Sequence, residues 1–121
     1  MNESTMPEKS IDWKLALQLT NGNRALAREM LELLVQELPK NRQEIAKTYD
    51  MKDIRGLREL IHKIYGGTCY CGVPKLKPLL IDIEDRLATY QLIGIEARLR
   101  QLDQEIVQIL EEAPAALAKD F

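Results

Sequence analysis

Apolar residues recur every three or four positions through long stretches of this chain, and this spacing limits the fold more than any other feature. This spacing begins after residue 24, and it appears again in the segments after residues 51, 74 and 95. Such spacing places apolar side chains on one face of a helix, whereas a half-buried strand would show alternation, and no segment alternates convincingly. The chain is therefore expected to be all-α.

Short breaks divide the repeat into helices of definite length. The breaks contain residues that favour caps and turns: Thr20–Asn23, Asp50, Gly72–Pro74 and Tyr90–Gly94. They predict a short helix capped by Ser10, a second helix from Arg24 through Pro39 towards Tyr49, and a third from near Met51 to about Gly72. A fourth helix should start at Pro74, and a fifth should run from Ile95 to Glu112, with Pro114 interrupting the chain just beyond it. Four long helices with short loops imply an antiparallel up-down four-helix bundle, with the short N-terminal helix covering one end.

Length and charge narrow the class of protein. A chain of 121 residues suits one hydrophobic core, so residues 1–9 are interpreted as a flexible tail and residues 10–121 as one domain. The net charge of -2 offers no reason to expect nucleic-acid or anionic-membrane binding. No apolar run approaches the roughly 20 residues of a spanning helix, and residues 1–10 lack the apolar stretch of a signal peptide. A cytoplasmic location is expected.

The two cysteines, Cys69 and Cys71, are expected to be reduced. Two positions apart on a helix, their side chains point away from each other, which disfavours a disulfide. A metal site could combine both thiols with His62, but structural zinc usually needs four ligands and Cys71 falls on the predicted buried side. We therefore expect no metal site.

The only histidine, His62, lies in the middle of the third predicted helix. At about 100° per residue, its face also holds Arg55, Arg58, Glu59, Tyr65, Gly66 and Cys69. Leu57, Leu60, Ile64 and Cys71 lie nearly opposite. His62 should thus point at solvent, and a neutral imidazole is a competent nitrogen nucleophile near neutral pH.

Two successive glycines, Gly66 and Gly67, come one turn after the histidine. Each costs a helix interior about 1 kcal/mol relative to alanine, so some other factor should offset the penalty. They could simply end the helix. Because the apolar pattern continues through Thr68 and Cys71, the alternative is favoured: a missing side chain at Gly66 lets another protein's surface approach the imidazole.

The segment His62–Thr68, HKIYGGT, resembles the signature of histidine-containing phosphotransfer (HPt) domains. In that signature a phosphorylatable histidine is followed at the fourth position by glycine and then by small residues, and Cys69 and Gly72 fit it as well. The segments IDWKLAL at 11–17, AREML at 27–31 and YCGVPKLK at 70–77 more closely resemble the C-terminal HPt domain of BarA/GacS-type hybrid sensor kinases. The likeness covers roughly residues 10–112. In one departure, Tyr65 stands where many HPt domains have lysine.

The resemblance implies a role for each residue of the face. His62 would accept a phosphoryl group from a receiver-domain aspartate and pass it to a response-regulator receiver. Gly66 and Gly67 would provide clearance, while Lys63 would balance phosphoryl charge, with Arg55, Arg58, Lys75 or Lys77 contributing nearby. Apart from the resemblance, Glu59 lies one turn before His62, where a hydrogen bond from its carboxylate would orient the imidazole. Tyr65 is expected either to contact the partner or to pack at the edge of the core, and Cys69 fits the docking surface as a small residue.

The resemblance also implies what the domain leaves to its partners. The domain would bind no cofactor, since Mg²⁺ would sit in the receiver, and it would work as a monomer. No nucleotide-binding motif is present, so autonomous kinase activity is not expected.

Two other functions fit a histidine on a helix. A histidine-kinase dimerisation hairpin normally has an acidic residue and then a proline after its histidine, whereas His62 precedes Lys63 and glycines. A non-catalytic module could dock partner helices through the same face. Only chemistry separates this second alternative from phosphotransfer.

Overall fold

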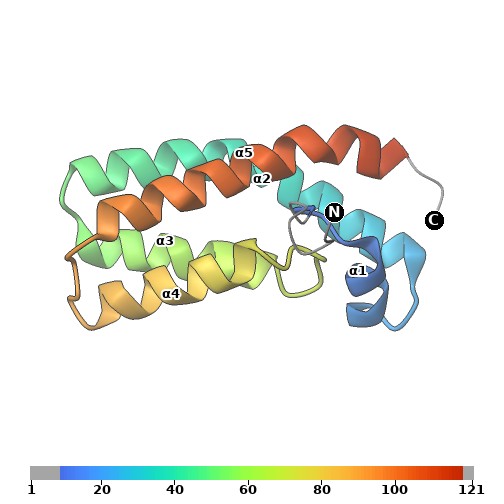
Figure 1. Cartoon of the computed structure of the whole chain (residues 1–121), viewed down its shortest axis with the longest axis horizontal. Helices are drawn as coiled ribbons and strands as arrows, with labels where there is room; N and C mark the ends of the chain where they lie inside the picture. Colours follow the sequence, from blue (N-terminus) through green and yellow to red (C-terminus); the bar gives the residue numbers. More distant parts are fainter. Residues whose placement is uncertain (1–8, 119–121) are drawn as a thin grey trace, which may run out of the picture.

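Five α-helices make up the regular structure of residues 9–118, the part of the chain that the computed structural model describes. They are α1 (Trp13–Leu19), α2 (Arg24–Asp50), α3 (Ile54–Gly67), α4 (Leu76–Ala88) and α5 (Ile95–Ala118). In Figure 1, α2 to α5 lie side by side in a bundle, and α1 packs against α2 at the end opposite the α2–α3 and α4–α5 loops. The predicted all-α bundle with a short N-terminal helix is confirmed. Most of the predicted tail, residues 1–8, lies outside the described residues.

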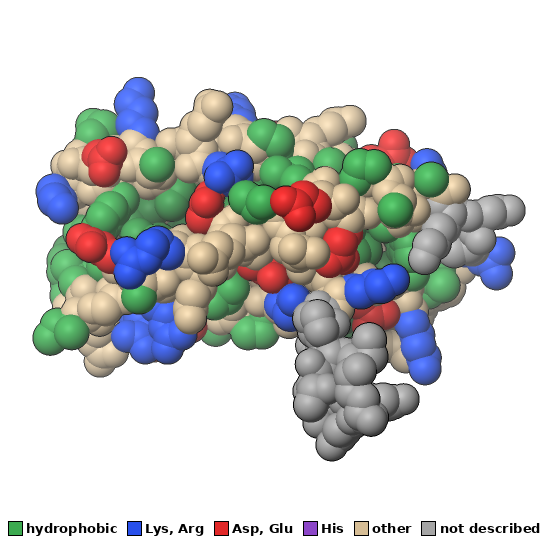
Figure 2. Space-filling view, turned by 45° about the horizontal axis from the view of Figure 1, so that its top comes forward, with side chains coloured by type: hydrophobic (Ala, Val, Ile, Leu, Met, Phe, Trp, Pro, Cys, Tyr) green, Lys and Arg blue, Asp and Glu red, His purple; other side chains and the backbone are tan. Residues whose placement is uncertain are grey.

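A single core fills the space between the four long helices. Each helix contacts its two neighbours in the order α2, α3, α4, α5 and back to α2. The largest fully buried side chains are aliphatic: Leu31, Leu38, Leu57, Ile61, Leu76, Leu80, Ile83, Leu87, Leu102, Ile106, Ile109 and Val73. Burial of one such side chain contributes about 1.5–3 kcal/mol, so the apolar repeat is what holds the bundle together. Figure 2 shows charged side chains of both signs interspersed with apolar ones on the side where α2 and α5 lie.

Two helices, α1 and α3, start later than predicted because an aspartate further along the chain caps each of them. Asp12, not Ser10, caps α1, since its carboxylate accepts a hydrogen bond from the Leu15 amide at 3.1 Å. Ser10 is buried instead. Asp53, not Asp50, caps α3 by accepting from the Gly56 amide at 2.8 Å.

The third helix ends at Gly67, five residues before the predicted stop at Gly72. Thr68 is the C-cap, and its hydroxyl donates to the Tyr65 carbonyl at 2.6 Å. Buried Thr68 and Cys71 continue the apolar pattern from a turn rather than a helix. Gly72 serves packing, because a Cβ there would lie 2.0 Å from the Asp12 carbonyl oxygen. The next helix, α4, starts at Leu76 rather than Pro74.

The predicted break at Pro114 is also wrong, since α5 continues through it to Ala118. Proline removes one helical hydrogen bond, but contacts from other helices hold the last turns. The Trp13 indole N–H donates to the Ala116 carbonyl at 3.0 Å, and the Arg28 guanidinium donates to the Leu117 carbonyl. Ala116 and Leu117 also pack against the core.

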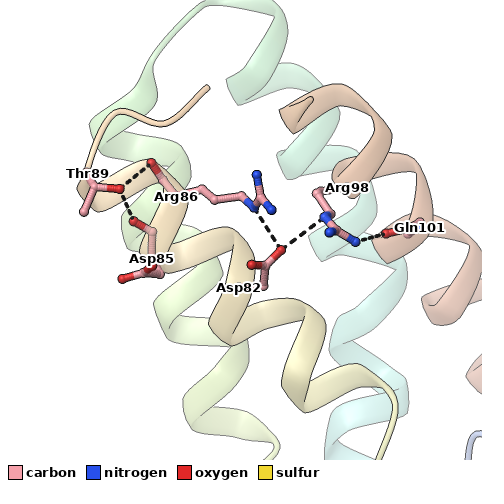
Figure 3. A network of polar contacts seen from close by, with 6 residues as sticks. All are labelled: Asp82, Asp85, Arg86, Thr89, Arg98 and Gln101. Atoms are coloured by element: carbon pink, nitrogen blue, oxygen red, sulfur yellow. Dashed lines mark hydrogen bonds and ion pairs between the residues drawn. The ribbon is translucent and has the colours of Figure 1, made fainter. Parts of the chain in front are cut away.

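Asp82 of α4 is the centre of an exposed polar network that reaches α5 (Figure 3). Asp82 pairs with Arg86 of the same helix at 3.0 Å and with Arg98 of α5 at 3.2 Å, and Arg98 also donates to Gln101. Exposed pairs of this kind contribute at most about 1 kcal/mol each, so they add little to the stability of the fold. Among residues 9–118, no helix is long and apolar enough to cross a membrane.

Candidate functional site

His62 projects from the middle of α3 into solvent, with 71% of its side chain exposed. Leu57, Ile61 and Ile64 on the other side of the same helix are buried in the core. The predicted outward orientation of the histidine is confirmed. The imidazole is therefore open to a second macromolecule.

One carboxylate, Glu84 of α4, holds the imidazole. The His62 Nδ1 atom lies 3.0 Å from Oε1 and 3.1 Å from Oε2 of Glu84, whose side chain is only 26% exposed. The role expected for Glu59 thus falls to Glu84, and Glu59 pairs with Arg55 at 3.4 Å. Sequence reasoning missed Glu84 because it lies 22 residues from the histidine on another helix.

This contact selects one tautomer of the neutral ring. An ionised carboxylate only accepts hydrogen bonds, so the ring nitrogen beside Glu84 carries the proton. The other nitrogen, Nε2, then holds the free lone pair and points away from Glu84. The geometry leaves Nε2 as the ring nitrogen that could act as a nucleophile.

The two glycines lie in the last turn of α3, one turn after His62. A Cβ built on Gly66 or Gly67 would meet no atom within 4 Å, so packing within the domain does not require glycine at either position. Neither adopts a left-handed conformation, which among the described glycines occurs at Gly22 and Gly94. They do precede the helix end, as the stop-signal interpretation expected, but they also leave open space beside the imidazole.

Three of the predicted cations lie on α3, the helix that carries His62, and no ion pair or hydrogen bond joins them to the imidazole among the described residues. Arg55, Arg58 and Lys63 are all exposed, and Arg55 is the one paired with Glu59. Lys75 lies elsewhere, 3.8 Å from the buried Glu105 of α5. Lys63 is the closest of these residues to His62 in sequence, and it lines a groove between α2 and α3.

Tyr65, Cys69 and Cys71 differ in how far their side chains are buried. Tyr65 packs partly against the core, whereas Cys69 is exposed and its thiol lies 3.8 Å from the backbone carbonyl of Tyr65. Both cysteines are free, as predicted. Burial raises the pKa of the Cys71 thiol to about 11. Among the described residues, no group of three His, Cys, Asp or Glu side chains could hold a metal ion.

The groove between α2 and α3 has a volume of about 240 Å³ and lies beside the glycines. Its apolar lining includes Leu33 and Tyr70, which are 49% and 55% exposed. Gly66, Gly67 and Lys63 line the edge nearest His62. Sequence reasoning missed the groove because Leu33 belongs to the apolar repeat of its helix and looked like a core residue.

Comparisons with known proteins agree with this geometry. The family model described as the Hpt domain matches residues 29–119. The signal transduction histidine-protein kinase BarA of Escherichia coli K12 is 34% identical over 106 residues, which is 88% of this chain but 11% of BarA. The sensor protein GacS of Pseudomonas syringae pv. syringae is 33% identical over 103 residues, 85% of this chain and 11% of GacS.

A solved structure shares the fold. The crystal structure of the HPT domain of a hybrid histidine kinase from Shewanella superposes with a TM-score of 0.83 and 29% identity. The match covers 90% of this chain and 94% of that domain. This chain thus spans most of that domain but about a tenth of the length of the curated relatives, 11% for BarA.

Proposed function

The chain belongs to the Hpt domain family, which performs histidine phosphotransfer in phosphorelays, and from this premise we propose that His62 carries the phosphoryl group. The observation that carries the proposal is the geometry of the ring. His62 is 71% exposed, and a carboxylate holds Nδ1 while Nε2 stays free.

The transfer step needs no proton movement in this site. Nε2 attacks the phosphorus of an aspartyl phosphate on a receiver domain in line with the bond to the aspartate oxygen. The new N–P bond forms as that P–O bond breaks, and the aspartate leaves as a carboxylate. The ring keeps its Nδ1 proton and gains positive charge, which Glu84 stabilises from 3.0 Å. The reverse reaction delivers the group to a second receiver.

Charge neutralisation and positioning dominate phosphoryl transfer, and most of both would come from the receiver, including Mg²⁺. On this domain, Lys63 would contact the phosphoryl oxygens, with Arg55 and Arg58 adding to the local positive charge. Gly66 and Gly67 would let the receiver come close. Tyr65 replaces the lysine common at its position, so Lys63 takes the main electrostatic role in our proposal.

The phosphorelay context is the other part of the proposal. We place this domain in the cytoplasm, as the C-terminal domain of a longer, membrane-bound hybrid sensor kinase. There it would receive the phosphoryl group from that kinase's receiver and pass it to a response regulator, working as a monomer. The support is that its relatives BarA and GacS are a histidine kinase and a sensor protein of which the matched region is 11%.

Incubation with a phosphorylated receiver tests the proposal directly. The protein should acquire an acid-labile, base-stable phosphoryl label, and His62→Gln should abolish the label while the melting temperature changes little. A label that persists in His62→Gln would refute the assignment. Receiver binding without any label in the unchanged protein would favour the non-catalytic docking module.

A further inference from the structure

Glu105 of α5 is a buried carboxylate whose capacity for hydrogen bonds the described residues do not fill. Only 9% of its side chain is exposed, and its Oε1 atom lies 3.8 Å from the Lys75 ammonium. Its Oε2 atom is buried and has no hydrogen-bond partner among residues 9–118. The distance to Lys75 is longer than a hydrogen bond, so the carboxylate lacks close donors. Buried carboxylates are normally hydrogen-bonded, because leaving one without donors costs free energy.

Glu105 and Lys75 both line a hollow between the start of α4 and the middle of α5, with a volume of about 680 Å³. Apart from Lys75, its α4 wall is apolar and consists of Pro74, Pro78 and Leu79. The hollow thus has an apolar wall on one side and a buried carboxylate on the other. It contains neither His62 nor any residue of the groove between α2 and α3.

The lining distinguishes between kinds of cation. A metal ion would need several protein ligands, and no group of three His, Cys, Asp or Glu side chains within residues 9–118 could hold one. An ammonium is already present on Lys75, and it leaves Oε2 of Glu105 without a donor. A guanidinium carries a planar fork of N–H donors that matches both oxygens of a carboxylate. It is also more weakly hydrated than an ammonium, so placing it against an apolar wall costs less.

We propose that this hollow binds a guanidinium group, which displaces the Lys75 ammonium and donates to both oxygens of Glu105. Lys75 can give way, because its long side chain is 34% exposed and its ammonium can turn into solvent. Another guanidinium N–H can donate to the side-chain oxygen of Gln104, which also lines the hollow. The group belongs either to a small molecule or to an arginine of a partner protein, and the chemistry of recognition is the same. This site is independent of the proposed phosphotransfer.

An NMR titration with methylguanidinium at constant ionic strength tests the site. The amide signals of residues 74–79 and 101–108 should shift and saturate. Methylammonium, which has the same charge without the fork, should bind about tenfold more weakly. Glu105→Gln should weaken methylguanidinium binding by about tenfold or more, whereas Glu111→Gln, at an exposed position of the same helix, should change it by less than about twofold. Shifts that do not saturate, or equal binding by Glu105→Gln, would overturn the proposal.

Replacing Lys75 gives a second test that leaves Glu105 in place. Lys75→Met keeps an apolar side chain but removes the cation beside a buried carboxylate, so the melting temperature should fall. Methylguanidinium should bind this variant about threefold more tightly than wild type, since no ammonium has to be displaced. It should also raise the melting temperature of Lys75→Met more than methylammonium does at the same concentration. Binding no tighter than in wild type would mean that the guanidinium does not replace Lys75, and the proposal fails.

A short peptide with one central arginine and blocked ends identifies the source of the guanidinium. If the peptide binds more tightly than methylguanidinium, the site takes an arginine of a partner protein. If it binds more weakly, the site takes a small molecule. Either order supports the site only when Glu105→Gln weakens the binding, and loss of that dependence would refute it.

Discussion

Replacing Glu84 tests the central electrostatic claim about His62. Two variants separate orientation from charge. In Glu84→Gln the side-chain oxygen can still accept from Nδ1–H, but the negative charge is gone. In Glu84→Ala both the acceptor and the charge are removed. Glu59→Gln is the control, because Glu59 lies on the same face as His62 but pairs with Arg55.

The expected loss of transfer rate depends on how exposed the contact between His62 and Glu84 is. A hydrogen bond to a charged group contributes about 1.5–3 kcal/mol when shielded, but an exposed ion pair contributes at most about 1 kcal/mol. Since the imidazole is 71% exposed and Glu84 is 26% exposed, we take the lower figure, about 1 kcal/mol. The contribution should be greatest once the ring has gained charge in the phosphorylated state. Glu84→Ala should therefore slow transfer by about fivefold, since about 1.4 kcal/mol corresponds to tenfold.

Nitrogen-15 NMR of the ring measures the tautomer, and single-turnover transfer measures the rate. Wild type and Glu59→Gln should both show the proton on Nδ1 in the neutral ring, and the phosphoryl group on Nε2 after transfer. Glu84→Gln should keep this tautomer but transfer more slowly, and Glu84→Ala should show mixed tautomers. If the ring in Glu84→Ala keeps its Nδ1 proton and transfers at the wild-type rate, Glu84 has no positioning role.

Three further outcomes test the surrounding structure. Gly66→Ala should raise the free energy of unfolding by up to about 1 kcal/mol in urea titrations. Gly66→Leu should slow transfer from a receiver without slowing labelling by the small phosphodonor phosphoramidate. Unchanged transfer in Gly66→Leu would mean that the glycine only ends the helix. Gly72→Ala should destabilise the fold by about 2 kcal/mol or more, because its Cβ would lie 2.0 Å from the Asp12 carbonyl oxygen, and equal urea midpoints would contradict this. Because the pKa of Cys71 is raised to about 11, this thiol stays protonated at neutral pH, so iodoacetamide should modify Cys69 alone until the protein is unfolded.

The helices themselves could be predicted because the spacing of apolar residues depends only on the segment that forms each helix. Leu57, Ile61 and Ile64 recur at helical spacing, and all three are buried. The ends could not be placed as well, since competing caps lie close together: Asp50 and Asp53 are three residues apart, and either could begin a helix. Choosing between them depends on where the neighbouring helix stops, which packing decides.

Two features that could not be predicted from the sequence depend on contacts between distant segments. Pro114 favours a break, but Trp13, about a hundred residues away, donates to the next turn of the helix and helps keep it formed. Likewise, Glu84 contacts His62 only because α3 and α4 pack in one particular register. The proposed nucleophile could therefore be chosen from its own helix, whereas the carboxylate that contacts it could not.

The arrangement of His62 explains how a domain with so little catalytic equipment can take part in phosphoryl transfer in two directions. A full set of catalytic groups around the ring would bury it and exclude a receiver. A single carboxylate on the α4 side fixes the tautomer and leaves the α2 side free. Because the phosphoryl group must both arrive and leave, donor and acceptor need access to the same nitrogen from the same side. Both should then compete for His62, so an excess of either unphosphorylated receiver should slow single-turnover transfer that involves the other.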